Sequence, residues 1–266
     1  MKVLIFWDVY GRLGRKALKS ELAKLKNTYD PDFTVVNIEN CTSGRWPIEE
    51  HAREIESLWV DLMTSWDHIY DQKDKILDYL NLENTKLIRP ANFLTSAWNP
   101  GKWYTILHKH NMRLLVIQLI WEVFMNHKVS NPFLKLQEIL KEIPRDSYDV
   151  SIVDFHKEVT AEIYGLWKYF DGELGLIFWT HTHIQTADAH VMQWWTWIIA
   201  DVGMVGPHDS IIWAEPESVI PRFLSGIQRG KISQQLKGES VISALFAEFD
   251  TQSNTCQHIE AIRYII

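Results

Sequence analysis

The stretch LGLIFWTHTHIQTAD, Leu174 to Asp188, runs apolar for several residues and then presents His181 and His183 with one threonine between them. A short apolar run of this kind predicts a buried β-strand. In an extended backbone, residues i and i+2 point to the same side, so both imidazoles can face one site. Taken alone, the pair fits a metal site and a pair of solvated or core-capping histidines about equally well.

Other short apolar runs also end in polar side chains. The run KVLIF (2–6) leads to Asp8, and DVSIVDF (149–155) leads to His156. Apolar residues at helical spacing follow most of these runs. The remaining elements expected on this basis are the strands 32–38, 60–65, 113–120 and 172–179 and the helices 15–27, 47–58 with Pro47 in its first turn, 72–82 and 157–170. Strands that alternate with helices predict an α/β protein with buried sheet strands.

The residues at these strand ends are of the kinds that bind metals or move protons. Strand 32–38 is followed by Glu39 and Asn40, and strand 60–65 is followed by Asp67 and His68. In open α/β sheets, functional groups gather beyond the carboxyl ends of the strands. Each residue alone has a plainer explanation as a cap, a turn residue or a core histidine. Because five strand ends all supply such side chains, we predict one functional site.

The ligand types favour a site for two metal ions. Three histidines beside carboxylates and a carboxamide fit Mn, Fe or Zn better than Ca or Mg, which favour all-oxygen sites. Seven candidate ligands exceed what one ion needs, which indicates two ions. The candidate metal ligands are Asp8, Glu39, Asn40, Asp67, His156, His181 and His183.

Composition and charge exclude several classes of protein. The chain has 266 residues, of which 46% are apolar and 23% charged, close to ordinary globular usage. A net charge of −7 argues against an extended nucleic-acid-binding surface, but leaves room for one nucleotide-sized site. No apolar run approaches the roughly 20 residues of a membrane span, and Cys41 and Cys256 give no disulfide framework. We therefore expect one domain, 1–266, in the cytoplasm, with no membrane partner.

The order of these motifs resembles a known family, the YmdB-like branch of the calcineurin-like metallophosphoesterases. The motifs that support the resemblance are Asp8, NIEN (37–40), DH (67–68), VDFH (153–156), THTHIQTAD (180–188), DVGMVGPHDS (201–210), RPANF (89–93), VFM (123–125) and NPF (131–133). The resemblance covers residues 1 to 266. It implies an α/β fold that is a four-layer αββα sandwich, in which two sheets pack face to face with helices outside. It also implies two divalent metal ions, iron or manganese first and zinc or magnesium as alternatives.

The same resemblance implies a role for each candidate residue. His68 matches the family's proton donor, and Glu39 matches its bridging carboxylate. The remaining ligands divide into one set for each ion: Asp8, Asn40 and His183 for the first, and Asp67, His156 and His181 for the second.

The reaction implied is hydrolysis of 2′,3′-cyclic nucleotides or similar phosphodiesters. A metal-bridging hydroxide would attack phosphorus, and His68 would protonate the leaving oxygen. The implied partner is a small-molecule phosphodiester or nucleotide, and a homo-oligomer is left open. Two alternatives remain: a phosphomonoesterase, and a weakly active regulatory or scaffold member of the fold.

The chain departs from the pattern of the YmdB-like branch at one position near the site, and from that of the wider superfamily at another. Asp67 stands where the family has the asparagine of Gly-Asn-His. Aspartate can bind metal as asparagine does, but it adds a negative charge beside the phosphate. We therefore expect Asp67 to affect rate and substrate affinity more than metal binding. Tyr10 stands where the wider superfamily has a histidine, and Asn40 compensates for that loss in the YmdB-like branch.

Tryptophan is unusually frequent, with 13 Trp against 12 Gly. By the family pattern, Trp7, Trp66 and Trp179 stand where relatives have glycine. Six more tryptophans fall at or near family glycine positions: Trp59, Trp103, Trp121, Trp167, Trp195 and Trp213. The other four, which lie in segments that match the family less closely, are Trp46, Trp98, Trp194 and Trp197. Glycine serves where φ is positive or where the backbone passes close to a ligand, so repeated replacement by an indole would reduce stability. We interpret these tryptophans as decoding artefacts. The gene would come from a lineage that reads the codon UGA as glycine, and it would have been translated with a code that reads UGA as tryptophan. A naturally tryptophan-rich protein is the alternative.

The nucleotide sequence of the gene tests this interpretation. We expect UGA at the tryptophan codons that match family glycines, and at Trp7, Trp66 and Trp179 in particular, because drift does not convert glycine to tryptophan repeatedly. Sequencing the gene reads these codons directly. The interpretation fails if the three positions carry UGG.

Overall fold

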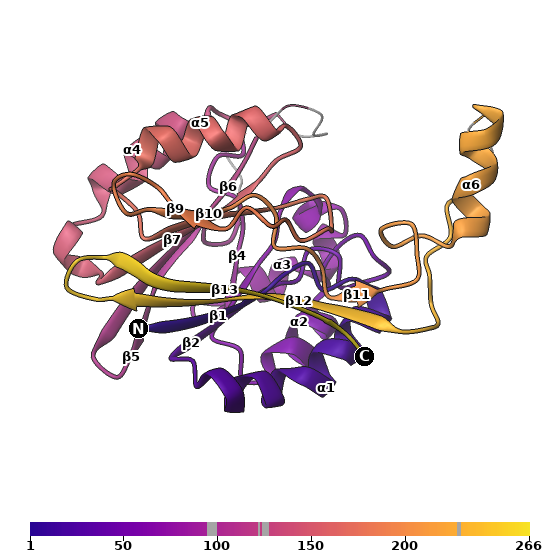
Figure 1. Cartoon of the computed structure of the whole chain (residues 1–266), viewed down its shortest axis with the longest axis horizontal. Coiled ribbons are helices and arrows are strands. Elements are labelled where there is room, and N and C mark those ends of the chain that lie inside the picture. The colour runs from indigo at the N-terminus through magenta and orange to yellow at the C-terminus, as the bar shows by residue number, and fades with distance from the viewer. Residues whose placement is uncertain (95–99, 122, 124–127, 228–229) are drawn as a thin grey trace.

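Two β-sheets form the centre of the molecule (Figure 1). The computed structural model describes residues 1–94, 100–121, 123, 128–227 and 230–266. Within these residues the first sheet has seven strands: β1 (Lys2–Phe6), β2 (Phe33–Asn37), β3 (Leu62–Thr64), β4 (Leu87–Ile88), β11 (Gly206–Pro207), β12 (Ser240–Asp250) and β13 (Thr255–Ile265). Its order is β11-β12-β1-β2-β3-β4, with β13 paired to β12. Strands β1 to β4 are parallel, and β12 is antiparallel to β1.

The second sheet has parallel strands in its middle and an antiparallel strand at each edge. In the described part of the chain it has six strands: β5 (Tyr104–Lys109), β6 (Met112–Ile120), β7 (Val150–His156), β8 (Leu176–Thr180), β9 (His190–Val191) and β10 (Trp197–Ile199). The order is β5-β6-β7-β8-β10-β9, and the antiparallel strands β5 and β9 form its two edges. The carboxyl ends of β7 and β8 therefore lie next to each other.

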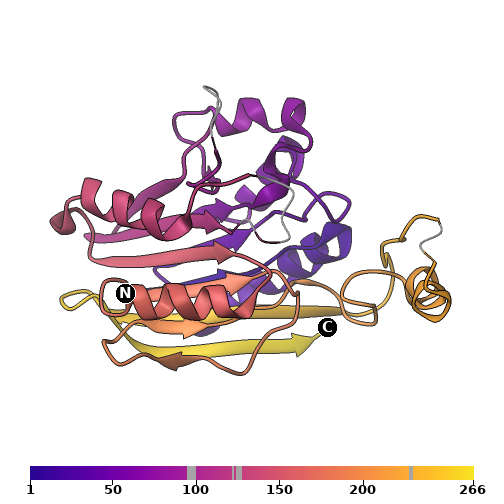
Figure 2. The same ribbon diagram turned by 90° about the horizontal axis from the view of Figure 1, so that it is seen from above.

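Helices cover the outer faces of both sheets (Figure 1), and seen from above the pink helices lie in front of the strands (Figure 2). The helices of the described residues are α1 (Gly11–Tyr29), α2 (Glu49–Glu56), α3 (Leu77–Leu80), α4 (Pro132–Glu142), α5 (Thr160–Phe170) and α6 (Pro216–Ser225). Helices α1 and α2 pack on the first sheet, and α4 and α5 on the second. The layers run helix, sheet, sheet, helix, which confirms the predicted αββα sandwich.

Strand β1 shows how the sequence builds these layers. Val3 and Ile5 point into the apolar core between the two sheets, whereas Leu4 and Phe6 point into the core under α1 and α2. Side chains alternate between the two faces of a strand. A strand that is buried on both faces reads as a continuous apolar run, as KVLIF does.

Several expected elements are present with different ends. Helix α2 begins at Glu49 with Ile48 as an extended N-cap, so Pro47 precedes the helix and does not lie in its first turn. The helix expected over 72–82 is a 3₁₀ turn, Lys73–Lys75, followed by the single turn of α3. Helix α1 begins at Gly11, earlier than the predicted residue 15.

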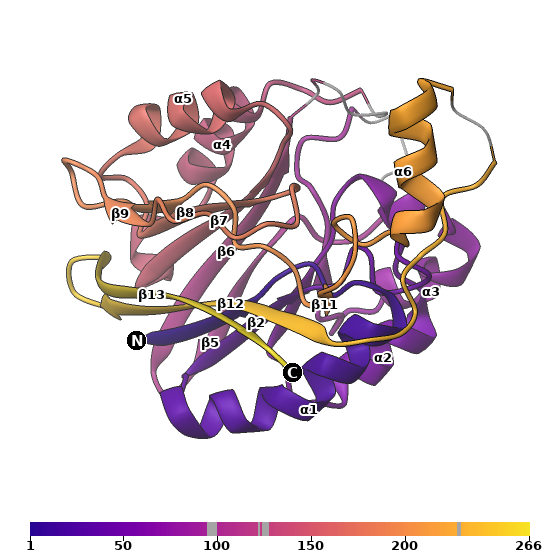
Figure 3. The same ribbon diagram turned by 45° about the vertical axis from the view of Figure 1, so that its right-hand side comes forward.

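The C-terminal part of the first sheet was not predicted. Strand β12 lies beside β1 near the middle of the sheet and pairs with β13 along its whole length. Helix α6 extends away from the sheets at one end of the molecule (Figure 3). None of the described helices is long and apolar enough to cross a membrane.

The tryptophans show two features that are unusual for this residue. Trp59 (φ 62°) and Trp195 (φ 78°) have the left-handed backbone that favours glycine. Among the buried ones, the indole nitrogens of Trp7, Trp167 and Trp179 have no hydrogen-bond partner within the described residues. Both features agree with glycine at such positions, and Trp98 lies outside the described residues.

Replacing Trp59 by glycine should raise the free energy of unfolding by about 1 kcal/mol, because an L-residue in the left-handed region is strained by about that amount. Trp59 is 84% exposed, so little packing is lost. Trp194→Gly is the matched control: Trp194 is 61% exposed but its φ is not positive, so glycine should not stabilise there. Urea denaturation measures both variants. A destabilised Trp59→Gly would contradict the argument.

Candidate metal centre

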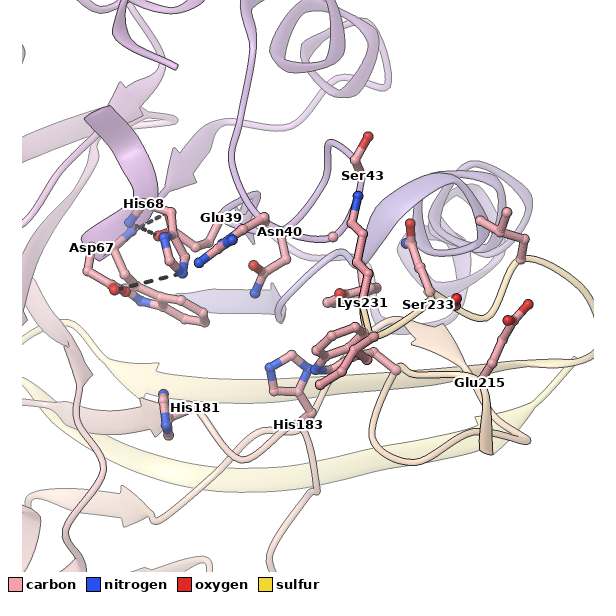
Figure 4. A pocket seen from close by; sticks show the side chains of 18 of the residues that line it. Glu39, Asn40, Ser43, Asp67, His68, His181, His183, Glu215, Lys231 and Ser233 are labelled. Carbon is pink, nitrogen blue, oxygen red and sulfur yellow. Dashed lines mark hydrogen bonds and ion pairs between the residues drawn. The ribbon is translucent and has the colours of Figure 1, made fainter. Parts of the chain in front are cut away.

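The carboxyl ends of β1, β2 and β3 from one sheet and of β7 and β8 from the other meet at a cavity of about 960 Å³. Most of the predicted site residues line it, and Figure 4 shows side chains from both sheets facing the same space. Asp8 lies behind the wall, in contact with two of the lining residues. The residues of the predicted site that line the cavity are Glu39, Asn40, Asp67, His68, His156, His181 and His183.

Asp8, Asn40 and His183 form the first cluster. Asn40 Nδ2 donates to Asp8 Oδ1 at 2.8 Å, and His183 Nε2 lies 3.2 Å from Asp8 Oδ2. Asp8 (φ 40°) and His183 (φ 66°) both have left-handed backbone, which is uncommon for residues other than glycine. Such strain persists where the surrounding structure imposes it, and it is frequent at functional sites.

Asp67, His156 and His181 form the second cluster. His156 Nε2 lies 3.2 Å from His181 Nδ1 and 3.6 Å from Asp67 Oδ1. The other ring nitrogen of His181, Nε2, contacts the carboxylate of Glu158. The structure therefore brings together the three residues that the sequence assigned to one ion.

Glu39 and His68 are joined to each other at the ends of β2 and β3. Glu39 is fully buried and accepts hydrogen bonds from the backbone N–H groups of Trp66, at 2.6 Å, and His68. The carboxylate thereby holds the turn after β3 against the end of β2. His68 Nδ1 lies 2.8 Å from Asp71 Oδ2, which leaves Nε2 directed toward the cavity, 3.8 Å from Asp67 Oδ2.

Burial sets the electrostatics of the site. It raises the pKa of Asp8 to about 7, and together with the nearby Asp67 it raises the pKa of Glu39 well above its usual range. It also lowers the pKa of His183 to about 4 and that of His156 well below its usual value. A divalent cation can bind neutral imidazole nitrogens and carboxylate oxygens together. Its charge would also offset the unfavourable burial of the negative carboxylates.

The candidate ligands have the donor types that two divalent ions need, but their positions do not yet form a complete coordination sphere. Across the described ranges, no three His, Cys, Asp or Glu side chains lie close enough together to form a ready metal cage. Three buried atoms of the candidate ligands, Asp8 Oδ2, His156 Nδ1 and His183 Nδ1, have no hydrogen-bond partner among the described residues.

Comparison with known proteins decides the family. The sequence model of the YmdB-like protein family matches residues 4–262, nearly the whole chain. The chain belongs to the YmdB-like family. It is 34% identical to the 2′,3′-cyclic-nucleotide 2′-phosphodiesterase of Bacillus subtilis (strain 168), over 98% of this chain and 96% of that protein.

Solved structures agree with this YmdB-like assignment. A protein from Mycoplasma pneumoniae described as a novel phosphatase superposes with a TM-score of 0.92 at 32% identity, over 100% of this chain and 93% of that one. A hypothetical protein from Thermus thermophilus superposes with a TM-score of 0.89 at 29% identity, over 100% of this chain and 99% of that one. The fold and its connections are therefore those of the family along the entire chain.

Asp201 is a residue of this YmdB-like site that sequence reasoning missed. Its Oδ2 accepts hydrogen bonds from the backbone N–H groups of His181 and Thr182, at 3.1 and 2.8 Å, and from the Thr182 hydroxyl at 2.7 Å. Asp201 thus fixes the loop that bears both histidines. The run IIAD (198–201) was the available indication, but β10 has only three residues and was not recognised as a strand.

The tryptophans at the strand ends differ in what they contact. Trp179 packs in the core between the second sheet and its helices, with Lys157 Nζ 3.0 Å from its ring centroid, so it stays out of the cavity. Trp66 does line the cavity and stacks on His156, with ring centroids 4.2 Å apart. Side chains alternate between the two faces of β8, so the indole of Trp179 points into that core and leaves the loop of His181 and His183 free of it.

Adding Mn²⁺ should raise the melting temperature of the metal-free protein, because the ion binds only the folded site. At about 100 times the dissociation constant, the gain is about 2.7 kcal/mol, which corresponds to several degrees for a chain of this size. Differential scanning fluorimetry with and without EDTA measures the shift.

Two variants show whether the shift comes from this site. His183→Ala removes a proposed ligand and should shrink the shift, whereas His108→Ala, on the exposed edge strand β5, should keep it. The absence of any shift with Mn²⁺, Fe²⁺, Zn²⁺ or Mg²⁺ would contradict a metal centre.

Proposed function

We propose that the chain is a metal-dependent phosphodiesterase that hydrolyses 2′,3′-cyclic nucleotides or similar small phosphodiesters. The observation behind this proposal is that seven motif side chains line one cavity and an eighth, Asp8, contacts two of them from behind its wall; together they come from five strand ends. The name of the B. subtilis relative supports the substrate class.

The proposal places two divalent ions in the cavity, iron or manganese first and zinc or magnesium as alternatives. When bound, such ions activate water as a nucleophile and offset the charge of the phosphate. Glu39 would help to hold both. The residues that would hold each ion are Asp8, Asn40 and His183 for one, and Asp67, His156 and His181 for the other.

His68 is the proposed proton donor to the departing ribose oxygen. Its Nε2 faces the cavity, and its Nδ1 contacts the Asp71 carboxylate. That contact orients the ring so that Nε2 is the nitrogen available to act as a general acid toward the departing oxygen. The backbone bond from His68 to Glu39 keeps the donor at a fixed place relative to the metal ligands.

The outer wall of the cavity suits a nucleotide. Arg45 and Lys231 lie there and can pair with phosphate oxygens. Tyr10 adds an aromatic ring to the wall of the cavity, against which a base can pack. The volume of about 960 Å³ is within the range of small-molecule sites.

A phosphomonoesterase is the second candidate, because the M. pneumoniae structure is described as a phosphatase. A third candidate is a weakly active regulatory or scaffold protein. Asp67 supports it, because the Asp67 carboxylate repels the incoming phosphate more than the family's asparagine does.

We also propose that residues 1–266 act as one domain in the cytoplasm. Cys41 and Cys256 are both free and buried, which suits a reducing compartment. Whether the protein forms a homo-oligomer stays open.

Assays with the Mn²⁺-loaded protein test the proposed activity. We expect 2′,3′-cyclic AMP and bis-p-nitrophenyl phosphate to be hydrolysed at least about tenfold faster than 3′-AMP and p-nitrophenyl phosphate, a difference of about 1.4 kcal/mol in the barrier. Faster turnover of the monoesters would favour the phosphomonoesterase. Two bound ions without turnover of either class would favour the scaffold.

In the same assay, His68→Ala tests the proton donor. It should lower kcat by about 10²- to 10⁴-fold, the usual contribution of a general acid, with metal content unchanged. His108→Ala, an exposed histidine of β5, serves as the control and should keep wild-type kcat. Unchanged turnover in His68→Ala would remove His68 from the mechanism.

A further inference from the structure

Glu158 is outside the predicted ligand set, yet its carboxylate contacts Nε2 of His181. It follows β7 two residues after His156, and its side chain is 42% exposed. On the other side of the same ring, Nδ1 of His181 faces His156 Nε2 at 3.2 Å. The imidazole of His181 is therefore held between a carboxylate and another candidate ligand.

This arrangement selects one tautomer of His181. A neutral imidazole has one N–H group, and an ionised carboxylate can only accept. The hydrogen therefore lies on Nε2, which donates to Glu158, and Nδ1 keeps its lone pair. That lone pair points toward His156 Nε2, which itself lies 3.6 Å from Asp67 Oδ1. Nδ1 is thus the atom of His181 available to a cation of the second cluster.

The two histidines of the THTH motif differ in this respect. His183 faces Asp8 with its Nε2, and its buried Nδ1 has no hydrogen-bond partner in the part of the chain that the structure describes. His181 has a carboxylate partner on the ring nitrogen directed away from its cluster. The loss of Glu158 should consequently affect one cluster and spare the other.

We propose that Glu158 is a positioning residue for the second ion site: it accepts the hydrogen bond of His181 Nε2 and so presents Nδ1 as the metal ligand. The effect on metal binding rests on the proposed function, whereas the effect on the tautomer does not. Carboxylates that hold a ligating histidine in this way fix the ring and raise its basicity, and removing them lowers metal affinity by about 10- to 100-fold.

Metal binding provides the first readout. Glu158→Ala should lower the affinity for one Mn²⁺ by about 10- to 100-fold and leave the other unchanged, as measured by titration calorimetry and by metal content after dialysis. Glu158→Gln keeps an acceptor oxygen and should stay closer to wild type. Glu173→Ala removes an exposed glutamate from the loop before β8 and should bind as the wild type does. If Glu158→Ala bound both Mn²⁺ ions with wild-type affinity, the proposal would be overturned.

The tautomer provides a second readout that needs no metal and no activity. In the metal-free wild type, a long-range ¹H–¹⁵N spectrum should show His181 protonated at Nε2, and Glu158→Ala should lose this preference. Protonation at Nδ1 in the wild type would overturn the proposal. If the wild type binds no ion at all, the metal centre of the proposed function fails, and the spectrum still decides the role of Glu158. Glu158→Gln, which preserves shape, guards against misfolding of the alanine variant.

Discussion

The burial of three carboxyl groups side by side is the constraint on which the rest of the site depends. Asp8, Glu39 and Asp67 follow β1, β2 and β3, and parallel pairing brings these three ends to one edge of the sheet. Each side chain is at most 6% exposed. Buried negative charge is unfavourable unless it is paired or bound to a cation. Two backbone N–H groups donate to Glu39, and the carboxamide of Asn40 donates to Asp8. These hydrogen bonds offset only part of the free energy that burying the charges costs.

The second sheet supplies the rest of the donor set. Strands β7 and β8 end beside each other and deliver His156, His181 and His183 to the same cavity. The apolar core between the sheets, which includes Val3 and Ile5, holds the two halves of the ligand set at a fixed separation. Packing between the sheets and the geometry of the site are therefore linked, since a shift of one sheet on the other would separate the carboxylates from the histidines.

A further set of carboxylates orients the site from outside the ligand set. Asp201 holds the loop of His181 and His183, Asp71 contacts His68, and Glu158 contacts His181. Each of the three acts on a histidine or on the backbone beside it. Precise placement of a donor atom needs such support, because a ligand side chain has rotatable bonds that the ligand itself does not restrain.

The sequence by itself determined the α/β class, the strand ends and the chemical types of the ligands, because side-chain periodicity and strand-end residues are local properties. It did not reveal that β12 lies beside β1, that Asp201 follows a three-residue strand, or that Pro47 precedes its helix. Only the tertiary structure decided which atoms meet within each set of candidate ligands and which nitrogen of His181 faces its partners. Those features depend on the pairing of strands far apart in sequence and on the packing of one sheet against the other, and no local pattern specifies either.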